Sequence, residues 1–248
     1  MRAKAAKKVL IALFWVLLWE VIALAVNNSI ILPRPDRVLI ALFNCALEPE
    51  FWLGAGLSAL RIAIGFLIGA VLGVIAAVIS KASPIVRDFL APVIGAAKSV
   101  PVAAFIILVL IWAGSGLVSL VVSAIITFPV LAVNTLAGLD SVDKRMLEVA
   151  EVFRMKPSAR VRAIYIPAIY SNLAAAFELG AGMAVRAGVA AEVIGQPLAS
   201  LGNEMYRAKI FLDTERVIAV AIVTVALGWA FSALAGEIIR RAFGEWDA

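Results

Sequence analysis

The chain has 248 residues, of which 64% are hydrophobic and 16% charged, with a net charge of +5 and a mean hydropathy of +1.04. Soluble domains average about 45–50% apolar and about 25% charged residues, so this composition indicates a membrane protein. Histidine is absent and Cys45 is the one cysteine, which excludes Ser-His and Cys-His catalytic pairs, metal sites built from His or Cys, and an intrachain disulfide.

A membrane-spanning helix needs about 20 mainly apolar residues, and six segments meet this length. They are expected at residues 9–26, 57–79, 89–112, 117–137, 169–192 and 217–239. Basic residues precede the first segment as in a secretory signal, but no convincing cleavage site follows, so we expect a retained helix. The sequence therefore predicts an all-α, polytopic membrane protein with about six transmembrane helices.

The third segment differs from the others because residues that oppose a regular span interrupt it. These residues are Pro92, Gly95, Lys98 and Pro101. Proline lacks the N–H that a helix needs, so we expect a break near Pro101. A short helix before it would lie along the membrane surface or re-enter the bilayer, and the path of residues 84–101 stays open.

The positions of lysine and arginine predict the orientation of the chain. Fourteen of the 22 fall at the two termini and in the loops after the second and fourth segments, whereas five fall in the remaining loops. Cytoplasmic loops are enriched in these residues, so both termini are expected in the cytoplasm. This topology accounts for the basic charge without a nucleic-acid partner.

One long polar loop, residues 138–168, contains a second helical pattern. Apolar residues recur at helical spacing through 143–154, which predicts a short amphipathic helix there with Asp140, Ser141 or Asp143 as N-cap. Its apolar face consists of Met146, Val149, Ala150 and Phe153. Pro157 indicates a break before a second short helix that reaches Pro167. The loop is either a docking surface for a partner or a helix lying on anionic lipid headgroups.

This loop resembles the signature of ABC-importer permeases, which reads Glu-Ala-Ala, three residues, Gly, nine residues, Ile, one residue, Leu-Pro. The corresponding positions are Glu148, Val149, Ala150, Arg154, Ile164, Ile166 and Pro167. Segments along residues 30–240 are similar to the nitrate, sulfonate and taurine branch of these permeases. They include Leu32-Pro33-Arg34-Pro35, Trp112-Ala113-Gly114, Ala190-Ala191-Glu192-Val193-Ile194-Gly195 and Asp213-Thr214-Glu215-Arg216-Val217.

The resemblance implies a type I ABC importer-like fold, with residues 1–248 as one permease domain and 138–168 as its cytoplasmic coupling loop. It implies a homodimer in a prokaryotic inner membrane, a cytoplasmic ABC ATPase dimer that carries ATP and Mg, and an extracytoplasmic solute-binding protein. The coupling residues would be Met146, Glu148, Val149, Ala150, Phe153, Arg154, Ile164 and Pro167. Arg154 occupies the place of the family glycine, so Pro157 is considered as the alternative site of the turn.

Charged residues within the apolar segments are candidates for a transport pathway because an ionisable group is costly in a membrane. Glu178 and Arg186 are eight residues apart, about 12 Å along a helix, so each needs a partner other than its neighbour. One interpretation places them, with other residues, along the route of an anionic solute. The pathway candidates are Arg61, Trp112, Asn134, Glu178, Arg186 and Glu192. The alternative is structural: Arg61 extends towards water, and Glu20 or Glu178 pairs between helices.

The loop at 196–216 would face outside, where the resembled family receives its solute-binding protein. The docking candidates are Arg207, Lys209, Asp213 and Arg216, with Glu204 and Glu215 beside them. A solvated loop without a partner is the alternative. Gly65, Gly69 and Gly73 repeat every four residues, which predicts close helix packing, mostly inside the chain.

Neither GxxxxGK[ST] nor GxGxxG occurs at a suitable position, so we expect no enzyme activity and no cofactor in this chain. ATP hydrolysis would belong to the partner subunit. The solute is expected to be small and anionic, such as nitrate, a sulfonate or taurine, or else similar to a thiamine precursor. The competing function is a secondary transporter or channel that needs no ATPase. An intramembrane enzyme is disfavoured because neither a GxSG serine nor paired intramembrane aspartates occur.

Overall fold

The computed structural model describes residues 2–99 and 101–243, and every regular element in these ranges is helical. The main helices are α1 (Arg2–Val26), α2 (Pro35–Leu47), α3 (Pro49–Ala82), α4 (Pro84–Ser99), α5 (Val102–Ala113), α6 (Val118–Asp140), α7 (Lys144–Val152), α8 (Pro157–Arg160), α9 (Ile166–Gly195), α10 (Leu201–Ile210) and α11 (Thr214–Phe243). Among the described residues, five helices are long and apolar enough to cross a membrane, or six if α4 and α5 form one bent span. The predicted all-α membrane fold is confirmed.

The third predicted span is broken as expected. Helix α4 ends at Ser99, α5 begins at Val102 with Pro101 as its N-cap, and the two axes differ by 103°. Val100 lies outside the described residues. Pro92 and Gly95, which were expected to interrupt the segment, lie inside α4 instead. Helix α4 buries none of its side chains, so it accommodates Pro92 without disturbing the core.

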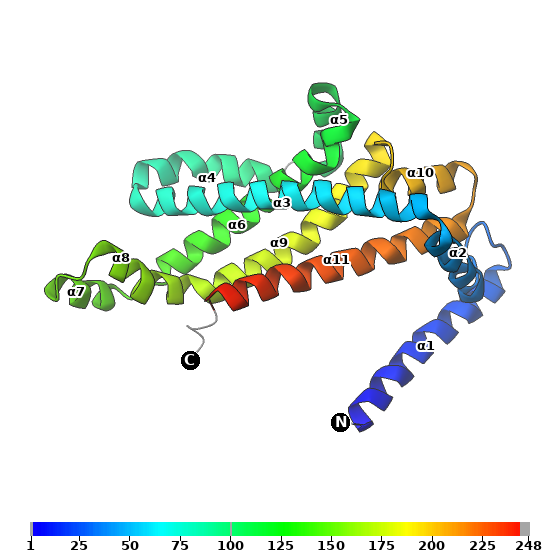
Figure 1. Ribbon diagram of the computed structural model, residues 1–248, viewed down its shortest axis with the longest axis horizontal. Helices are drawn as coiled ribbons and strands as arrows, with labels where there is room; N and C mark the ends of the chain where they lie inside the picture. Colours follow the sequence, from blue (N-terminus) through cyan, green and yellow to red (C-terminus); the bar gives the residue numbers. More distant parts are fainter. Residues whose placement is uncertain (1, 100, 244–248) are drawn as a thin grey trace.

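Helices α3, α6 and α9 form the interior of the bundle (Figure 1). The glycines of α3 face α6: a Cβ atom at Gly69 would collide with the carbonyl oxygen of Ala124, and Gly65 and Gly73 meet the α6 backbone in the same way. Only residues without a side chain let the two helices approach this closely. Because lipid provides no hydrophobic driving force between helices, dispersion contacts at this close approach stabilise their packing instead. The predicted intrachain role of this repeat is confirmed.

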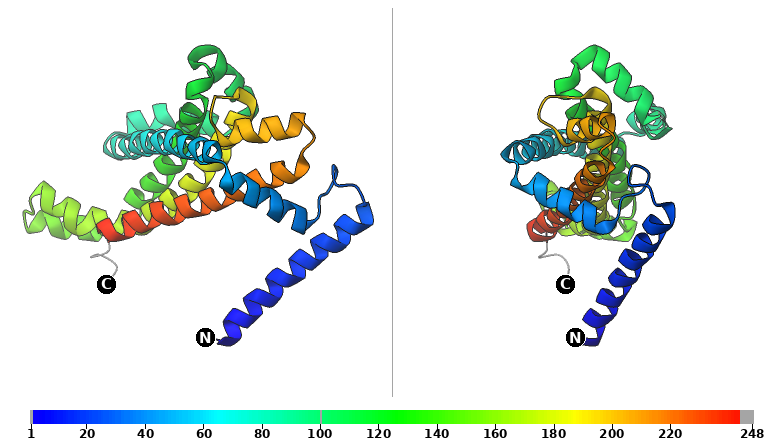
Figure 2. Two further views of the ribbon diagram at one scale, coloured as in Figure 1. Left: turned by 45° about the vertical axis from the view of Figure 1, so that its right-hand side comes forward. Right: turned by 90° about the vertical axis from the view of Figure 1, so that its right-hand side faces the viewer.

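The elements are distributed unequally between the two ends of the long axis (Figures 1 and 2). Helices α7 and α8 lie at one end, which we call the α7 end, and the last turn of α11 is directed towards it. Helices α2 and α10 lie at the other, which we call the α10 end. Helix α1 projects from the bundle, and only 6% of its apolar window is buried. It is attached mainly at its second half, where the indole nitrogen of Trp19 donates a hydrogen bond to the carbonyl of Pro33, 3.1 Å away.

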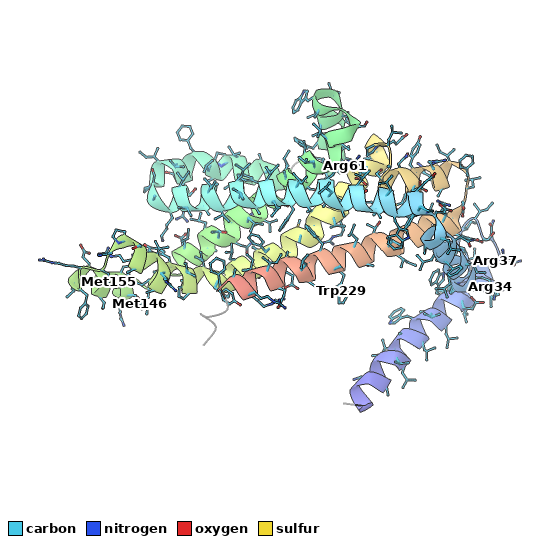
Figure 3. All side chains as sticks on the ribbon, viewed as in Figure 1. Arg34, Arg37, Arg61, Met146, Met155 and Trp229 are labelled. Atoms are coloured by element: carbon cyan, nitrogen blue, oxygen red, sulfur yellow. The ribbon has the colours of Figure 1, made fainter. Side chains whose placement is uncertain are left out.

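The outer surface of the bundle is apolar between these ends. Trp229 points away from the bundle in Figure 3, and Leu67, Val71 and Val225 are also exposed. A monomeric soluble protein rarely exposes so much contiguous apolar surface. This surface suits lipid contact and leaves the polar features at the two ends and along α9.

Candidate functional site

Helix α7 is the predicted short amphipathic helix, and the structure confirms it at Lys144–Val152. Asp143 is its N-cap and accepts a hydrogen bond from the backbone nitrogen of Arg145 at 2.9 Å. Met146, Val149 and Phe153 are more than half exposed at the α7 end. Ala150, expected on the same outward face, is instead 1% exposed because it packs against its own chain. This face of α7 therefore carries three large apolar side chains, and Glu148 and Val152 are exposed beside it.

The chain turns at Arg154, where the resembled signature has glycine. Arg154 has φ +49°, its N–H bonds the carbonyl of Glu151, and the N–H of Met155 bonds the carbonyl of Ala150, both at 2.9 Å. This pair of bonds is the Schellman motif, in which the left-handed position usually holds glycine. Pro157 was considered as the alternative turn, but it begins α8. Position 154 therefore has a left-handed backbone although it holds arginine instead of the glycine of the signature.

The returning half of the loop leads directly into α9. A π-helical turn at Val161–Tyr165 joins α8 to α9, and the continuous helix runs from Pro157 to Gly195. The signature residue Ile164 is 8% exposed within this turn, and Pro167 lies in the first turn of α9. A guanidinium nitrogen of Arg160 reaches the carbonyl of Ala150 at 3.4 Å. The loop is thus folded as one unit with α9.

Asp140 fastens the start of this loop to the rest of the bundle. Its carboxylate oxygens lie 2.8 Å from the Lys81 amine and 3.0 Å from the Arg87 guanidinium, on α3 and α4. From the sequence, Asp140 was predicted only as a possible cap. The pairing had no local signal, because Lys81 is 59 residues away in the chain.

Glu178 and Arg186 lie on the exposed side of α9 and do not pair with each other. Glu178 pairs with Arg240 of α11 at 3.7 Å, and the Arg186 side chain donates to the carbonyl of Gly182 at 3.2 Å. Both side chains remain open to the surroundings. The expected separate partners are confirmed, and Glu178 joins two helices, although its side chain is half exposed rather than buried.

Glu192 is enclosed within the subunit with 0% exposure. It accepts hydrogen bonds from the Ser58 hydroxyl at 2.6 Å and the Gly202 amide at 3.4 Å, and Arg61 lies 4.0 Å away. Ser58 also accepts from the amide of Leu201 at 2.9 Å. These bonds hold the turn between α9 and α10 against α3. In this conformation Glu192 connects helices, and its predicted role along a pathway stays a prediction.

Two of the remaining pathway candidates, Trp112 and Asn134, lie apart from this cluster. Trp112 is exposed at the end of α5, and the Asn134 amide donates to the carbonyl of Val130 in its own helix at 2.8 Å. Arg61 reaches towards the carbonyl oxygens of Leu198 and Ala199. Within the described ranges, no hydrogen bond or ion pair joins Trp112 or Asn134 to the charged candidates.

Glu20 pairs with Arg34 at 2.8 Å, which joins α1 to the turn before α2. This contact supports the structural interpretation of Glu20. Its partner lies outside the predicted spans, so the pair ties a helix to a loop rather than one span to another.

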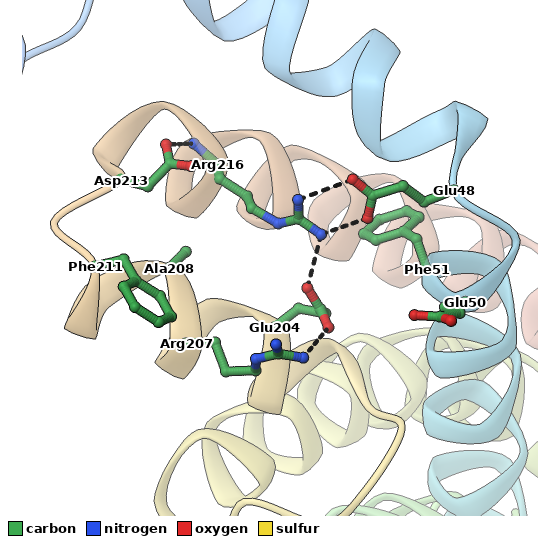
Figure 4. Close-up of a pocket in the computed structure, with 9 residues that line it drawn as sticks. All are labelled: Glu48, Glu50, Phe51, Glu204, Arg207, Ala208, Phe211, Asp213 and Arg216. Carbon is green, nitrogen blue, oxygen red and sulfur yellow. Dashed lines mark hydrogen bonds and ion pairs between the residues drawn. The ribbon is translucent and has the colours of Figure 1, made fainter.

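A cavity of about 400 Å³ lies at the α10 end, between α10, the start of α11 and the α2–α3 junction (Figure 4). Arg216 bonds both carboxylate oxygens of Glu48, at 2.6 and 3.0 Å, and Glu204 at 2.9 Å. This hydrogen bonding lowers the pKa of Glu48 below its ordinary value. Glu48 was not predicted as a site residue from the sequence, because it lies 168 residues from Arg216.

The four docking candidates therefore differ in their surroundings. Arg216 is 27% exposed and engaged within the chain, whereas Arg207, Lys209 and Asp213 are exposed. Arg207 lies 3.8 Å from Glu204, and Asp213 accepts from the backbone nitrogen of Arg216. Arg207, Lys209 and Asp213 offer accessible charges at the α10 end. Arg216 holds together the helices that carry them.

Comparisons with known proteins agree on one family. Residues 69–243 match the family described as the binding-protein-dependent transport system inner membrane component. The chain is 29% identical to the aliphatic sulfonates transport permease SsuC of Bacillus subtilis, over 85% of this chain and 77% of that protein. It is 26% identical to the taurine transport permease TauC of Escherichia coli, over 92% and 84%. A crystal structure of an amino acid ABC transporter with histidines has a TM-score of 0.61 and 22% identity, over 78% of this chain and 94% of that one, and supports the fold.

Proposed function

The chain belongs to the family of binding-protein-dependent transport inner membrane components, and from this premise we propose that it is the membrane-spanning subunit of an ATP-driven importer. The observation that carries the proposal is the unpartnered apolar surface of α7, which lies inside the matched region. In the proposal, residues 1–248 form one permease domain and 138–168 its coupling loop. A secondary transporter would leave this surface unexplained.

The coupling step follows from the packing of the loop. Met146, Val149 and Phe153 insert into a groove of a cytoplasmic ABC ATPase, and Glu148 pairs with a basic residue of that partner. Ala150 and Arg154 shape the turn between α7 and α8. Ile164 and Pro167 lie where the loop enters α9. Because one continuous helix runs from the loop through α9, closure of the ATPase dimer would move α9 directly.

The pathway is proposed along the exposed side of α9, where a second copy of the chain would complete it. Arg186 is an accessible cation in the second half of this helix, and its planar guanidinium suits a small oxyanion. Glu178, Arg61, Trp112, Asn134 and Glu192 complete the proposed set. The sulfonate and taurine permeases among the relatives favour such an anionic solute.

The partners and orientation complete the proposal. Both termini and the α7 end face the cytoplasm of a prokaryotic cell, and the ATPase dimer carries ATP and Mg. An extracytoplasmic solute-binding protein docks at the α10 end, where Arg207, Lys209 and Asp213 are exposed and Arg216 positions the helices. Membrane lipid surrounds the apolar surface of the bundle.

The test is ATP hydrolysis by the ABC ATPase that co-purifies with the chain, measured in lipid nanodiscs with and without the chain. We expect ATP hydrolysis to depend on the presence of the chain. In Glu148→Ala, hydrolysis should no longer respond to the chain. Glu151→Ala, also exposed on α7, is the matched control and should remain coupled. Solute flux in proteoliposomes of the chain alone, with no ATPase bound, would instead establish a secondary transporter.

A further inference from the structure

A second polar cavity, of about 310 Å³, lies where α1 ends and the chain turns into α2. Its lining combines donors and apolar groups: Ala23, Leu24, Asn27, Asn28, Ser29, Leu32, Arg34 and Arg37. We call it the α1–α2 pocket. Figure 3 shows Arg34 and Arg37 together at this junction. The pocket is separate from the cavity beside α10 and has no role in the function proposed above.

The walls of the pocket are held in place by bonds within the chain. Asn27 takes a left-handed conformation with φ +48°, and the Asn28 side-chain oxygen accepts from the Ile30 amide at 3.0 Å. The Trp19 bond to the Pro33 carbonyl and the Glu20–Arg34 pair fasten the opposite sides. A binding site formed in advance avoids the entropic cost of ordering its loop.

Arg37 is the cation left without an acidic partner. Arg34 pairs with Glu20 at 2.8 Å and lies 3.5 Å from Asp36, whereas Arg37 has no ion pair within residues 2–99 and 101–243. Arg37 belongs to the first turn of α2, where the helix dipole also favours an anion. The side-chain amide of Asn28 and the hydroxyl of Ser29 supply further donors at the lining.

The apolar part of the lining indicates the kind of anion. Leu24 belongs to α1, whose exposed side chains along Val9–Val26 form an apolar surface suited to lipid. Donors therefore meet this surface at the end of a span, at the depth of lipid headgroups. We propose that the α1–α2 pocket binds a tetrahedral oxyanion, the phosphodiester of a phospholipid whose acyl chains lie along α1.

The bound phosphodiester accepts from the Arg37 guanidinium and from the donors of Asn28 and Ser29. Guanidinium and phosphate match in geometry, which gives short charge-assisted hydrogen bonds. Because α1 contacts the bundle so little, a headgroup held at this junction also fixes the direction of α1 relative to α2. The site acts as a lipid anchor for α1, whose apolar window is only 6% buried.

Native mass spectrometry of the delipidated chain tests this proposal without an ATPase or a transported solute. Phosphatidylglycerol is titrated into wild type, Arg37→Gln and Asn28→Asp, with diacylglycerol as the ligand that lacks the phosphodiester. Arg37→Gln removes a charge that has no acidic partner. Asn28→Asp keeps the oxygen that caps the Ile30 amide but adds a repelling charge. Arg241→Gln is the control for the loss of one positive charge at the end of another span, where Arg241 is 81% exposed and pairs with Glu237 at 2.8 Å.

We expect one phosphatidylglycerol to bind wild type and Arg241→Gln, about tenfold weaker binding to both pocket variants, and no retention of diacylglycerol. Equal affinity in all four proteins, or equal losses in Arg37→Gln and Arg241→Gln, would overturn the proposal. Inorganic phosphate and methanesulfonate are then added in excess. Displacement of the lipid from wild type by either ion would show that the pocket takes its oxyanion from solution, and would overturn the lipid assignment.

Discussion

The two ends of the bundle complete their surfaces in different ways. At the α10 end, Arg216 is paired with Glu48 and Glu204, so the principal charges are matched inside the chain. At the α7 end, Phe153 is 76% exposed and lies beside Met146 and Val149 without a covering element. Paired charges remain compatible with water, whereas clustered apolar side chains usually mark a surface that another protein or a membrane covers. The α7 end therefore offers an apolar surface where the ATPase is proposed, whereas the α10 end combines its paired charges with the exposed Ile210, Phe211 and Leu212.

The largest expected effect comes from matched substitutions of one phenylalanine at each end. Phe153 and Phe211 are 76% and 77% exposed. Phe153→Asp should weaken retention of the ABC ATPase by about thirtyfold, the scale of a 2 kcal/mol hot-spot residue, because it places a charge in the proposed groove. Phe211→Asp should leave ATPase retention unchanged. Co-purification with titrated ATPase measures retention by both variants. Equal losses of retention in Phe153→Asp and Phe211→Asp would contradict the proposed difference between the two ends.

The next effect concerns the stability of the α10 end. Arg216→Met should lower the free energy of unfolding by about 1 kcal/mol, because it leaves the partly exposed Glu48 and Glu204 without their shared donor. Arg207→Met removes the same charge from an exposed side chain and should cost less than about 0.5 kcal/mol. Unfolding in mixed detergent micelles gives both values. Similar values for the two variants would show that the network contributes nothing beyond a surface pair.

A smaller effect is expected at the turn of the coupling loop. Arg154→Gly removes the cost of a left-handed side chain but adds backbone entropy, for a net gain of about 0.5 kcal/mol. Arg145→Gly makes the same change inside α7 and should cost about 1 kcal/mol. Amide hydrogen exchange of residues 149–154 should slow about twofold in the first and quicken about fivefold in the second. Faster exchange in Arg154→Gly than in wild type would contradict the expected cost of the left-handed backbone at Arg154.

The smallest effect is the pH dependence of the Glu48–Arg216 pair. The pair lowers the pKa of Glu48 in the folded state, so its stabilisation is complete above the pKa of a free glutamate, about 4.3. It is lost as the pH falls through the lower folded value. As the pH falls across this range, the free energy of unfolding should decrease more steeply in wild type than in Glu48→Gln. In an Arg216→Met background, Glu48→Gln should no longer alter the profile.

Some of the site could be predicted because its signals are local. The α7 helix and its Asp143 cap depend on residues within a few positions of one another, whereas the sequence left the turn open between Arg154 and Pro157. The contacts of Glu192 with Ser58 and of Arg216 with Glu48 join residues 134 and 168 positions apart. No spacing rule connects such residues, so Ser58 and Glu48 could not be singled out from one sequence. Pro92 shows that a local signal can also mislead. Proline was expected to interrupt the segment, but Pro92 lies inside α4, whose side chains are not buried.

The sequence by itself determined the membrane class, the spans and the amphipathic loop, because each depends on hydropathy summed over neighbouring residues. It also placed Gly65, Gly69 and Gly73 on one face of a helix, since helical periodicity is local. Only the tertiary structure decided which carboxylates pair, that Ala150 turns inward, and that Arg34 and Arg37 line one pocket. These outcomes depend on how distant helices pack, and packing selects among partners that hydropathy alone leaves equivalent.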